Sequence, residues 1–229
     1  MKNRTYNQYC GLAYALDVVG ERWTLLIVRE LIAGPRRFKD LIDGLPDIST
    51  NLLSERLKSL EQQGVLGRRT LPPPAGSTVY ELTPLGQALE ATLLELGKWG
   101  SQFVPPAPEG AHVLRAGSYA LTLKTFFRPE QARGVRATYA LRVGAETLRV
   151  SIADGRIDVR QGDAAGADTV FHLDVPTYLG LLQRLIDPDV ALAAGLVRAE
   201  GDPRELGRFL DLCGLPAAEP AVSGTIGRA

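Results

Sequence analysis

The sequence is poor in the residues that build metal sites, disulfide frameworks and catalytic centres. It contains only two cysteines, Cys10 and Cys213, and two histidines, His112 and His172, in 229 residues. These are too few and too scattered for a disulfide framework or a zinc site. Neither a glycine-rich phosphate loop nor a Gly-x-Ser-x-Gly nucleophile elbow occurs. We therefore expect no metal, no cofactor and no enzymatic activity.

Long apolar runs are missing as well. No stretch reaches the roughly 18–20 apolar residues that a membrane-spanning helix needs, and the first eight residues lack the apolar core of a signal peptide. We expect a cytoplasmic protein with no membrane partner. Hydrophobic residues make up 45% of the chain and charged residues 23%, which is typical of a folded globular protein.

The sequence has no excess of positive charge. Its 26 basic residues are balanced by 26 acidic residues, and residues 1–104 hold 12 Lys and Arg against 11 Asp and Glu, a difference of +1. Contacts with phosphate supply most of the non-specific affinity of a protein for DNA. If this chain binds DNA, its cations must therefore be placed locally.

A proline-rich segment divides the chain. Residues 104–110 contain three prolines and a glycine, a composition typical of a semi-rigid linker. Helical periodicity dominates before this segment and strand alternation after it. We predict a first domain at 1–104, a linker at 105–112, a second domain at 113–215 and a disordered tail at 216–229.

The first domain has the element order of a winged helix-turn-helix. Apolar periodicity and punctuation by Gly and Pro predict helices near 10–19, 22–33, 38–43 and 48–63. A hairpin of strands at 65–70 and 78–82 follows. The next helix starts at Thr83 and Pro84 and carries an apolar stripe, formed by Leu85, Leu89, Leu93, Leu96 and Trp99.

The helix at 48–63 is the predicted reading element. Leu53, Leu57 and Leu60 share one face, so Asn51 and Lys58 project from the opposite face. A helix fits the major groove of DNA, where asparagine pairs with adenine and lysine with guanine or phosphate. Basic residues before this pair of helices and at the base of the wing would contact the backbone. The predicted DNA interface consists of Arg36, Arg37, Lys39, Thr50, Asn51, Ser54, Lys58, Arg68 and Arg69. The alternative is that these side chains form ordinary solvated faces.

This half of the chain carries a set of specific motifs: GERWT at 20–24, GPRRF at 34–38, IS at 48–49, LSERL at 53–57 and YELTPLG at 80–86. In these motifs it resembles the HxlR family of winged-helix regulators. The resemblance implies a homodimer, formed by the N-terminal and post-wing helices, on a pseudo-palindromic double-stranded DNA operator. Without this resemblance, the apolar stripe of the helix after the hairpin could equally pack inside its own domain.

Cys10 matches an N-terminal cysteine that some HxlR family members use to sense oxidants or electrophiles. The chain departs from the family at Gly11, where proline is usual. We expect Asp17 and Glu21 to raise the pKa of the Cys10 thiol, because a nearby negative charge disfavours the thiolate. A buried, inert cysteine is the alternative.

The second domain shows strand alternation and a helix. A helix is predicted near 113–128. Apolar residues then alternate with polar ones at 138–143, 148–152, 157–160 and 171–175, which predicts an antiparallel sheet with one apolar face. A further helix starts at Pro176, and a last strand lies at 196–199. The fold class is therefore α+β: a winged helix-turn-helix followed by this sheet domain.

The closing half of the second domain carries three motifs: DTVFHL at 168–173, YLGLL at 178–182 and GLVRAEGD at 195–202. On these motifs, residues 113–213 resemble the sterol carrier protein-like fold. It implies a cavity between sheet and helices that holds lipids or other apolar molecules. The predicted cavity lining is Tyr139, Leu141, Phe171, Leu173, Tyr178 and Leu182. The alternative is an ordinary core, because a core and a pocket lining look alike in sequence.

The function predicted from these observations is a dimeric DNA-binding transcriptional regulator that is modulated by a small apolar ligand in its C-terminal domain. Two alternatives stay open: a carrier of lipids or other small molecules, and a thiol-redox-sensing regulator that uses Cys10. The operator, the effector and the sign of regulation do not follow from the sequence.

Overall fold

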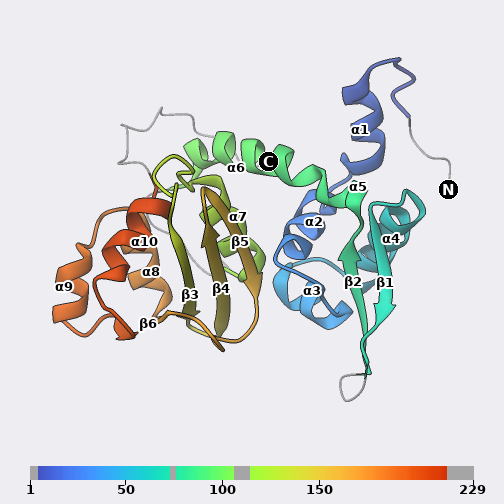
Figure 1. The fold of residues 1–229 in the computed structure, drawn as a ribbon. Helices are drawn as coiled ribbons and strands as arrows, with labels where there is room; N and C mark the ends of the chain where they lie inside the picture. Colours follow the sequence, from blue (N-terminus) through green and yellow to red (C-terminus); the bar gives the residue numbers. More distant parts are fainter. Residues whose placement is uncertain (1–4, 73–75, 106–113, 216–229) are drawn as a thin grey trace. The chain divides into compact units, whose positions relative to one another are not determined.

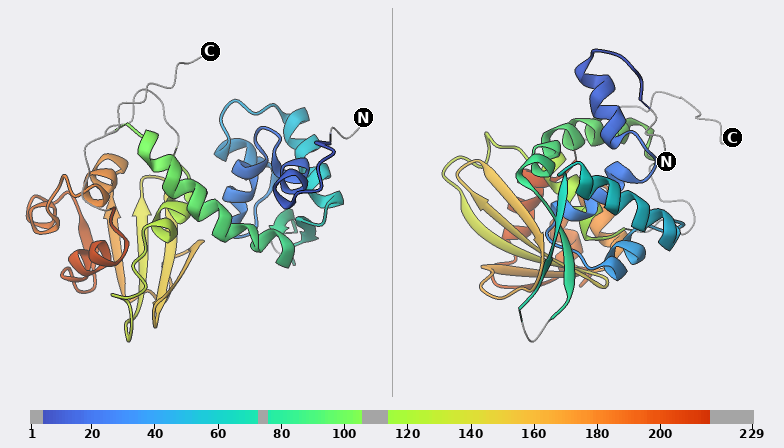
Figure 2. Two further views of the ribbon diagram at one scale, coloured as in Figure 1. Left: turned by 90° about the horizontal axis from the view of Figure 1, so that it is seen from above. Right: turned by 90° about the vertical axis from the view of Figure 1, so that its right-hand side faces the viewer.

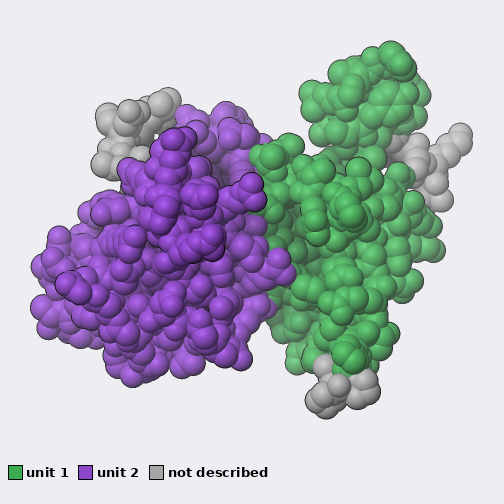
Figure 3. All heavy atoms as spheres, in the orientation of Figure 1, with its two compact units in different colours: residues 1–93, 113–118 green, residues 94–112, 119–229 purple. Residues whose placement is uncertain are grey.

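The computed structural model describes residues 5–72, 76–105 and 114–215. The chain forms two compact units, residues 1–93 with 113–118 and residues 94–112 with 119–229 (Figure 3). Two of the three boundaries between the units fall inside helices, one in α6 (Leu89–Gly100) and one in α7 (Ala116–Thr125). The predicted linker, apart from Pro105, and the predicted tail lie outside the described residues. The predicted domain limits therefore stay predictions.

Unit 1 combines short helices with a two-stranded hairpin (Figure 1). The hairpin extends past the helices beside it (Figure 2). Its strands pair antiparallel with Arg68 opposite Tyr80, as the predicted wing requires. The elements in chain order are α1 (Gly11–Val19), α2 (Thr24–Ile32), α3 (Phe38–Gly44), α4 (Thr50–Gln62), β1 (Leu66–Thr70), β2 (Thr78–Leu82) and α5 (Pro84–Gln87).

The limits of α4 follow from local chemistry. The Ser49 hydroxyl accepts a hydrogen bond from the Leu52 amide at 3.2 Å and caps the first turn. Gly64 ends the helix with a φ of 72°, a left-handed conformation that glycine adopts without strain. The predicted helix at 48–63 is thereby confirmed within two residues.

Unit 2 is built on a five-stranded sheet in the order β5-β4-β3-β6-β7. Its apolar face is buried along Tyr139, Leu141, Leu148 and Val150, as the alternation predicts. The ring of Phe209 in α10 lies 5.3 Å from that of Tyr139, so α10 covers this face. The elements are β3 (Arg136–Val143), β4 (Glu146–Ala153), β5 (Arg156–Gln161), β6 (Thr169–Leu173), α8 (Val175–Leu182), α9 (Pro188–Ala193), β7 (Arg198–Glu200) and α10 (Glu205–Cys213), with a 3-10 turn at Ser101–Phe103 after α6.

The sheet of unit 2 is mixed, which corrects the prediction of an antiparallel sheet. β3 pairs antiparallel with β4 but parallel with β6. The chain leaves β5 at one edge and passes β4 and β3 before β6 joins on the far side of β3. Alternation along one strand reports which face is buried but not which strand lies beside it. The sequence pattern could therefore not reveal the parallel pair.

Within the described ranges, no helix is both long enough and apolar enough to span a lipid bilayer.

Candidate nucleic-acid interface

The candidate interface is centred on the outward face of α4. Leu53, Leu57 and Leu60 are at most 2% exposed and pack α4 against the rest of unit 1. The polar residues of the opposite face, Thr50, Asn51, Ser54 and Lys58, are all exposed. Unit 1 therefore presents short hydrogen-bonding side chains and one cation on a helix whose other side is fixed.

Arg56 ties α4 to the connection between α1 and α2. Its guanidinium lies 3.0 Å from Glu21 Oε2, and its Nε donates to the Arg22 carbonyl at 3.3 Å. Trp23, the next residue of that connection, has a left-handed φ of 78°. Its ring packs against the Arg22 guanidinium, with 5.3 Å between Arg22 Cζ and the ring centroid. The motifs GERWT and LSERL thus meet in space, which gives their residues a structural role in orienting α4.

Both wing arginines are paired with carboxylates. Arg68 Nε donates to Glu61 Oε1 of α4 at 2.8 Å, and Arg69 Nε donates to Glu81 Oε2 at 2.7 Å. The Glu61 carboxylate also raises the pKa of Arg68. These are exposed pairs, which contribute little to stability. A phosphate can therefore replace either carboxylate at low cost.

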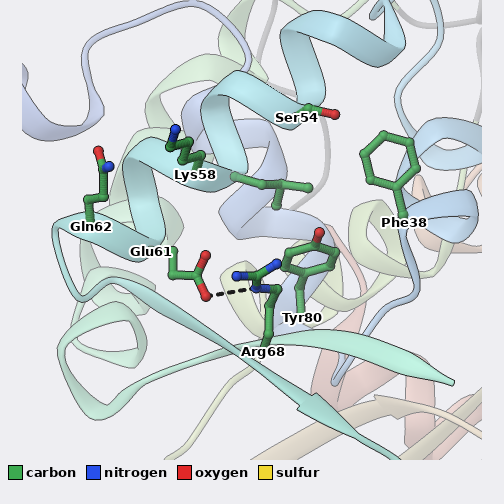
Figure 4. A pocket seen from close by; sticks show the side chains of 8 residues that line it. Phe38, Ser54, Lys58, Glu61, Gln62, Arg68 and Tyr80 are labelled. Atoms are coloured by element: carbon green, nitrogen blue, oxygen red, sulfur yellow. Dashed lines mark hydrogen bonds and ion pairs between the residues drawn. The ribbon is translucent and has the colours of Figure 1, made fainter. Parts of the chain in front are cut away.

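A cleft of about 460 Å³ lies between α4 and the wing (Figure 4). In the figure, the Arg68 guanidinium crosses it toward Glu61, beside the Tyr80 ring. The residues that line it are Phe38, Ser54, Leu57, Lys58, Glu61, Gln62, Arg68 and Tyr80. The cleft therefore shares Ser54, Lys58 and Arg68 with the predicted interface.

The predicted phosphate clamp before α3 needs one correction. Arg36 is only 5% exposed, its Nε donates to the Glu30 carbonyl at 3.2 Å, and its backbone pairs with Tyr80. A buried guanidinium in this position cannot reach a phosphate, so Arg36 is removed from the predicted set. Its neighbours Arg37 and Lys39 are exposed and stay in it.

Sequence reasoning missed the acidic and aromatic members of this surface. In the hairpin, Glu81 pairs with Gly67 and Arg69 pairs with Val79, so Glu81 lies diagonally across from Arg69. The hairpin register could have revealed this pair. Glu61 and Phe38 approach the wing only through the packing of α3 and α4, for which the sequence carries no local signal.

Comparisons with known proteins agree with this geometry. The model of the HxlR-like helix-turn-helix family matches residues 18–108. The HTH-type transcriptional regulator YodB of Bacillus subtilis is 41% identical over 92 residues, which cover 40% of this chain and 82% of YodB. The chain belongs to the HxlR-like helix-turn-helix family. Membership in this family of helix-turn-helix regulators implies DNA binding.

One further relative of this HxlR-type chain, YvaP, and a solved structure of YodB itself come from the same organism. The uncharacterized HTH-type regulator YvaP is 40% identical over 93 residues, 41% of this chain and 86% of YvaP. The solved structure of reduced YodB is 38% identical with a TM-score of 0.38, and the match covers 44% of this chain and 100% of that one. The model of the SCP-2 sterol transfer family matches residues 122–212, so an SCP-2 domain follows the HxlR-type domain.

The residues predicted to line a cavity in the SCP-2 domain are buried, except for Leu173, which is half-buried. Tyr139 lies against Phe171 and Phe209, with ring centroids at 6.1 and 5.3 Å. The Tyr139 hydroxyl donates to Glu205 Oε2 at 2.6 Å, and burial raises its pKa. This end of the predicted lining is thus well packed and its polar atom is satisfied.

Tyr178 differs from the rest of the predicted lining. It is 4% exposed, its ring contacts Tyr119 edge-on at 4.9 Å, and burial raises its pKa well above the ordinary value. Its hydroxyl has no hydrogen-bond partner within the described part of the chain. Buried polar groups are almost always paired with protein, water or a ligand, so the hydrogen-bonding capacity of this hydroxyl is unused by the described residues.

Cys10 is exposed, directly before the first turn of α1. Hydrogen bonds from the backbone of Ala13 and Leu12 lower the pKa of its thiol, as expected at a helix N-terminus. The expectation that Asp17 and Glu21 raise this pKa is wrong, because the pKa is lowered and neither carboxylate contributes to the shift. Asp17 accepts a hydrogen bond from the Thr5 hydroxyl, and Glu21 pairs with Arg56. The inert buried cysteine is Cys213, whose pKa burial raises to about 12.

Proposed function

We propose that this HxlR-type regulator acts as a homodimer that places one α4 from each protomer in successive major grooves of a pseudo-palindromic operator. A small apolar ligand in the SCP-2 domain modulates this binding. The observation that carries the proposal is the exposed polar face of α4, opposite a leucine face that is fully buried.

Each exposed residue of the interface has a role on DNA. Asn51 reads an adenine edge, and Lys58 reads guanine or neutralises a phosphate. Arg37 and Lys39 contact the backbone before α3, and the wing arginines exchange their carboxylates for phosphates. Ser54 and Thr50 contribute hydroxyl donors from the same face of α4.

Exposed apolar side chains support the dimer. Tyr9 is 102% exposed and Leu12 68%, and within unit 1 α1 projects from the other helices (Figure 1). Only Ala13 and Val19 of α1 are buried. In α6, Trp99 is 60% exposed. Exposed apolar surface of this kind marks an interface, and a symmetric partner would cover the same residues on both copies.

A gel-shift measurement tests the DNA-binding half. Fragments selected from a random pool would be titrated with the wild-type chain and with Asn51→Ala plus Lys58→Ala. Because a good pair between a side chain and a base edge is worth about 1–3 kcal/mol, the double variant should lose about tenfold or more in affinity. Gln63→Ala at the exposed end of α4 is the control. Equal affinity of all three proteins would refute the assignment of α4.

Tyr178 supports the ligand half and provides its test. An apolar pocket orients its ligand with a few polar groups, and the unpaired Tyr178 hydroxyl is a candidate for one of them. Native mass spectrometry of the purified chain would detect a retained small molecule, and gel-shifts would show whether adding it changes operator affinity. Tyr178→Phe should weaken such a ligand without unfolding the core. A ligand bound with no effect on DNA would favour a carrier function instead.

The exposure and lowered pKa of Cys10 favour a second candidate, a thiol-sensing regulator. In this mode an oxidant or electrophile modifies the Cys10 thiolate and alters the projecting α1. The test compares operator binding of wild type and Cys10→Ser before and after treatment with a quinone or peroxide. If both proteins respond alike, Cys10 is not the sensor.

A further inference from the structure

The cleft between α4 and the wing has the chemistry of a small-molecule site (Figure 4). Its volume of about 460 Å³ lies within the range of about 300–1,000 Å³ typical of ligand pockets. Neither the family matches nor the predicted cavity in unit 2 assigns anything to it. All the residues that line it belong to unit 1.

The walls of the cleft favour a flat ring. Phe38 comes from the start of α3 and Tyr80 from β2, and both are half-buried. Leu57, which is 2% exposed, forms an apolar floor. Aromatic side chains bind planar rings by edge or offset-stacked contacts, so the apolar part of an occupant would be aromatic.

The charges of the cleft favour a single negative charge. Lys58 is exposed, and in the described ranges its ammonium has no ion-pair partner. Arg68 is the second cation, and its Nε forms an ion pair with Glu61 Oε1 at 2.8 Å. Two cations and one carboxylate leave a net charge of +1, which one carboxylate of a ligand would neutralise.

We propose that this cleft binds a planar aromatic monocarboxylate. The ring lies over Leu57 between Phe38 and Tyr80, and the carboxylate pairs with Lys58 and the guanidinium of Arg68. Because Ser54 and Lys58 also belong to the proposed DNA interface, the bound acid competes directly with DNA. This second step rests on the proposed function, whereas binding of the acid does not.

Direct binding is measured first, on the full chain without DNA, by calorimetry with sodium 1-naphthoate as the probe. 1-Naphthamide has the same rings without the charge and should bind at least about tenfold more weakly, as expected for a lost charge-assisted pair. Gln62→Trp places a bulky ring at the rim of the cleft and should abolish binding. Gln63→Trp, one residue further along and outside the lining, is the matched control and should bind as wild type does.

Glu61→Gln provides a test of opposite sign. Removal of this carboxylate raises the net charge of the cleft and releases Arg68, so naphthoate should bind about threefold more tightly or better. A site that held only the apolar rings would not respond to this change. Weaker or unchanged affinity would refute the assignment of the charge.

Competition is measured last, by fluorescence anisotropy of a labelled selected DNA. The apparent Kd for DNA should rise in proportion to naphthoate concentration in wild type and in Gln63→Trp, but not in Gln62→Trp. If the chain binds no DNA through α4 while naphthoate binding depends on Gln62, the proposed function fails and the cleft stands. If wild type binds no naphthoate, or Gln62→Trp binds it equally, the cleft proposal is overturned.

Discussion

Gly86 is the position in the winged helix where the addition of one methyl group should lower the free energy of unfolding most. It is buried in α5, and a Cβ there would lie 2.0 Å from the Val65 carbonyl oxygen and 3.1 Å from Leu82 Cδ2. The same carbonyl accepts hydrogen bonds from the Thr83 amide at 3.1 Å and the Thr83 hydroxyl at 3.2 Å. We predict that Gly86→Ala disrupts the junction that holds both strands of the wing.

The magnitude follows from three contributions. Overpacking a tight core site typically costs about 1–3 kcal/mol, and here the obstacle is backbone, which has no alternative rotamer. Displacing the Val65 carbonyl also weakens two hydrogen bonds worth about 1 kcal/mol each. The better helix propensity of alanine returns about 1 kcal/mol. We therefore expect a net loss of about 2–4 kcal/mol in the free energy of unfolding.

Urea unfolding, followed by the fluorescence of Trp23 in a Trp99→Phe background, would measure this loss in unit 1. Gly67→Ala is the matched control, since a Cβ at that position in β1 has no neighbour within 4 Å. It should be neutral or more stable by up to about 1 kcal/mol. Wild-type stability of Gly86→Ala would refute the steric argument, as would equal losses in both variants.

Three further predictions concern the interface, the thiols and a helix cap. Leu12→Glu combined with Trp99→Glu should convert the dimer into monomers in light scattering, and a wild-type mass would contradict the proposed interface. Iodoacetamide should label Cys10 with a pH midpoint below the ordinary thiol value, while Cys213 should stay unlabelled until the chain unfolds. Equal labelling of both thiols in the native chain would contradict this. Asp174 caps α8 through the Thr177 amide at 2.8 Å, which lowers its pKa. Asp174→Ala should lower the free energy of unfolding by about 1 kcal/mol at neutral pH. The loss should shrink as the pH falls through the lowered pKa of Asp174, because the wild type loses its charged cap there. A loss that stays constant with pH would contradict this assignment.

Helix α4 could be predicted from its own residues. The spacing of Leu53, Leu57 and Leu60 defines the buried face of α4, and Ser49 and Gly64 mark its ends. The wing follows from alternation on both sides of a proline-rich tip. In each case the signal lies within one segment, because burial on one side of a helix or strand imposes a period on that segment.

The charged groups around α4 could not be assigned in the same way. Arg36 and Arg37 are adjacent and alike in sequence, yet Arg36 is buried against the Glu30 carbonyl and Arg37 is exposed. Arg68 would be predicted as a free cation, yet it pairs with Glu61 across the cleft. Each outcome depends on which segments meet, and no local pattern records that.

The amino-acid sequence by itself determined the elements, their buried faces and the family, because these rest on the period of apolar residues and on motifs within single segments. Only the tertiary structure decided that β6 runs parallel to β3, that Arg68 pairs with Glu61 across the cleft, and that the Tyr178 hydroxyl is buried with no partner among the described residues. Those features are contacts between distant parts of the chain, and their free energies depend on packing that forms only when the whole domain folds.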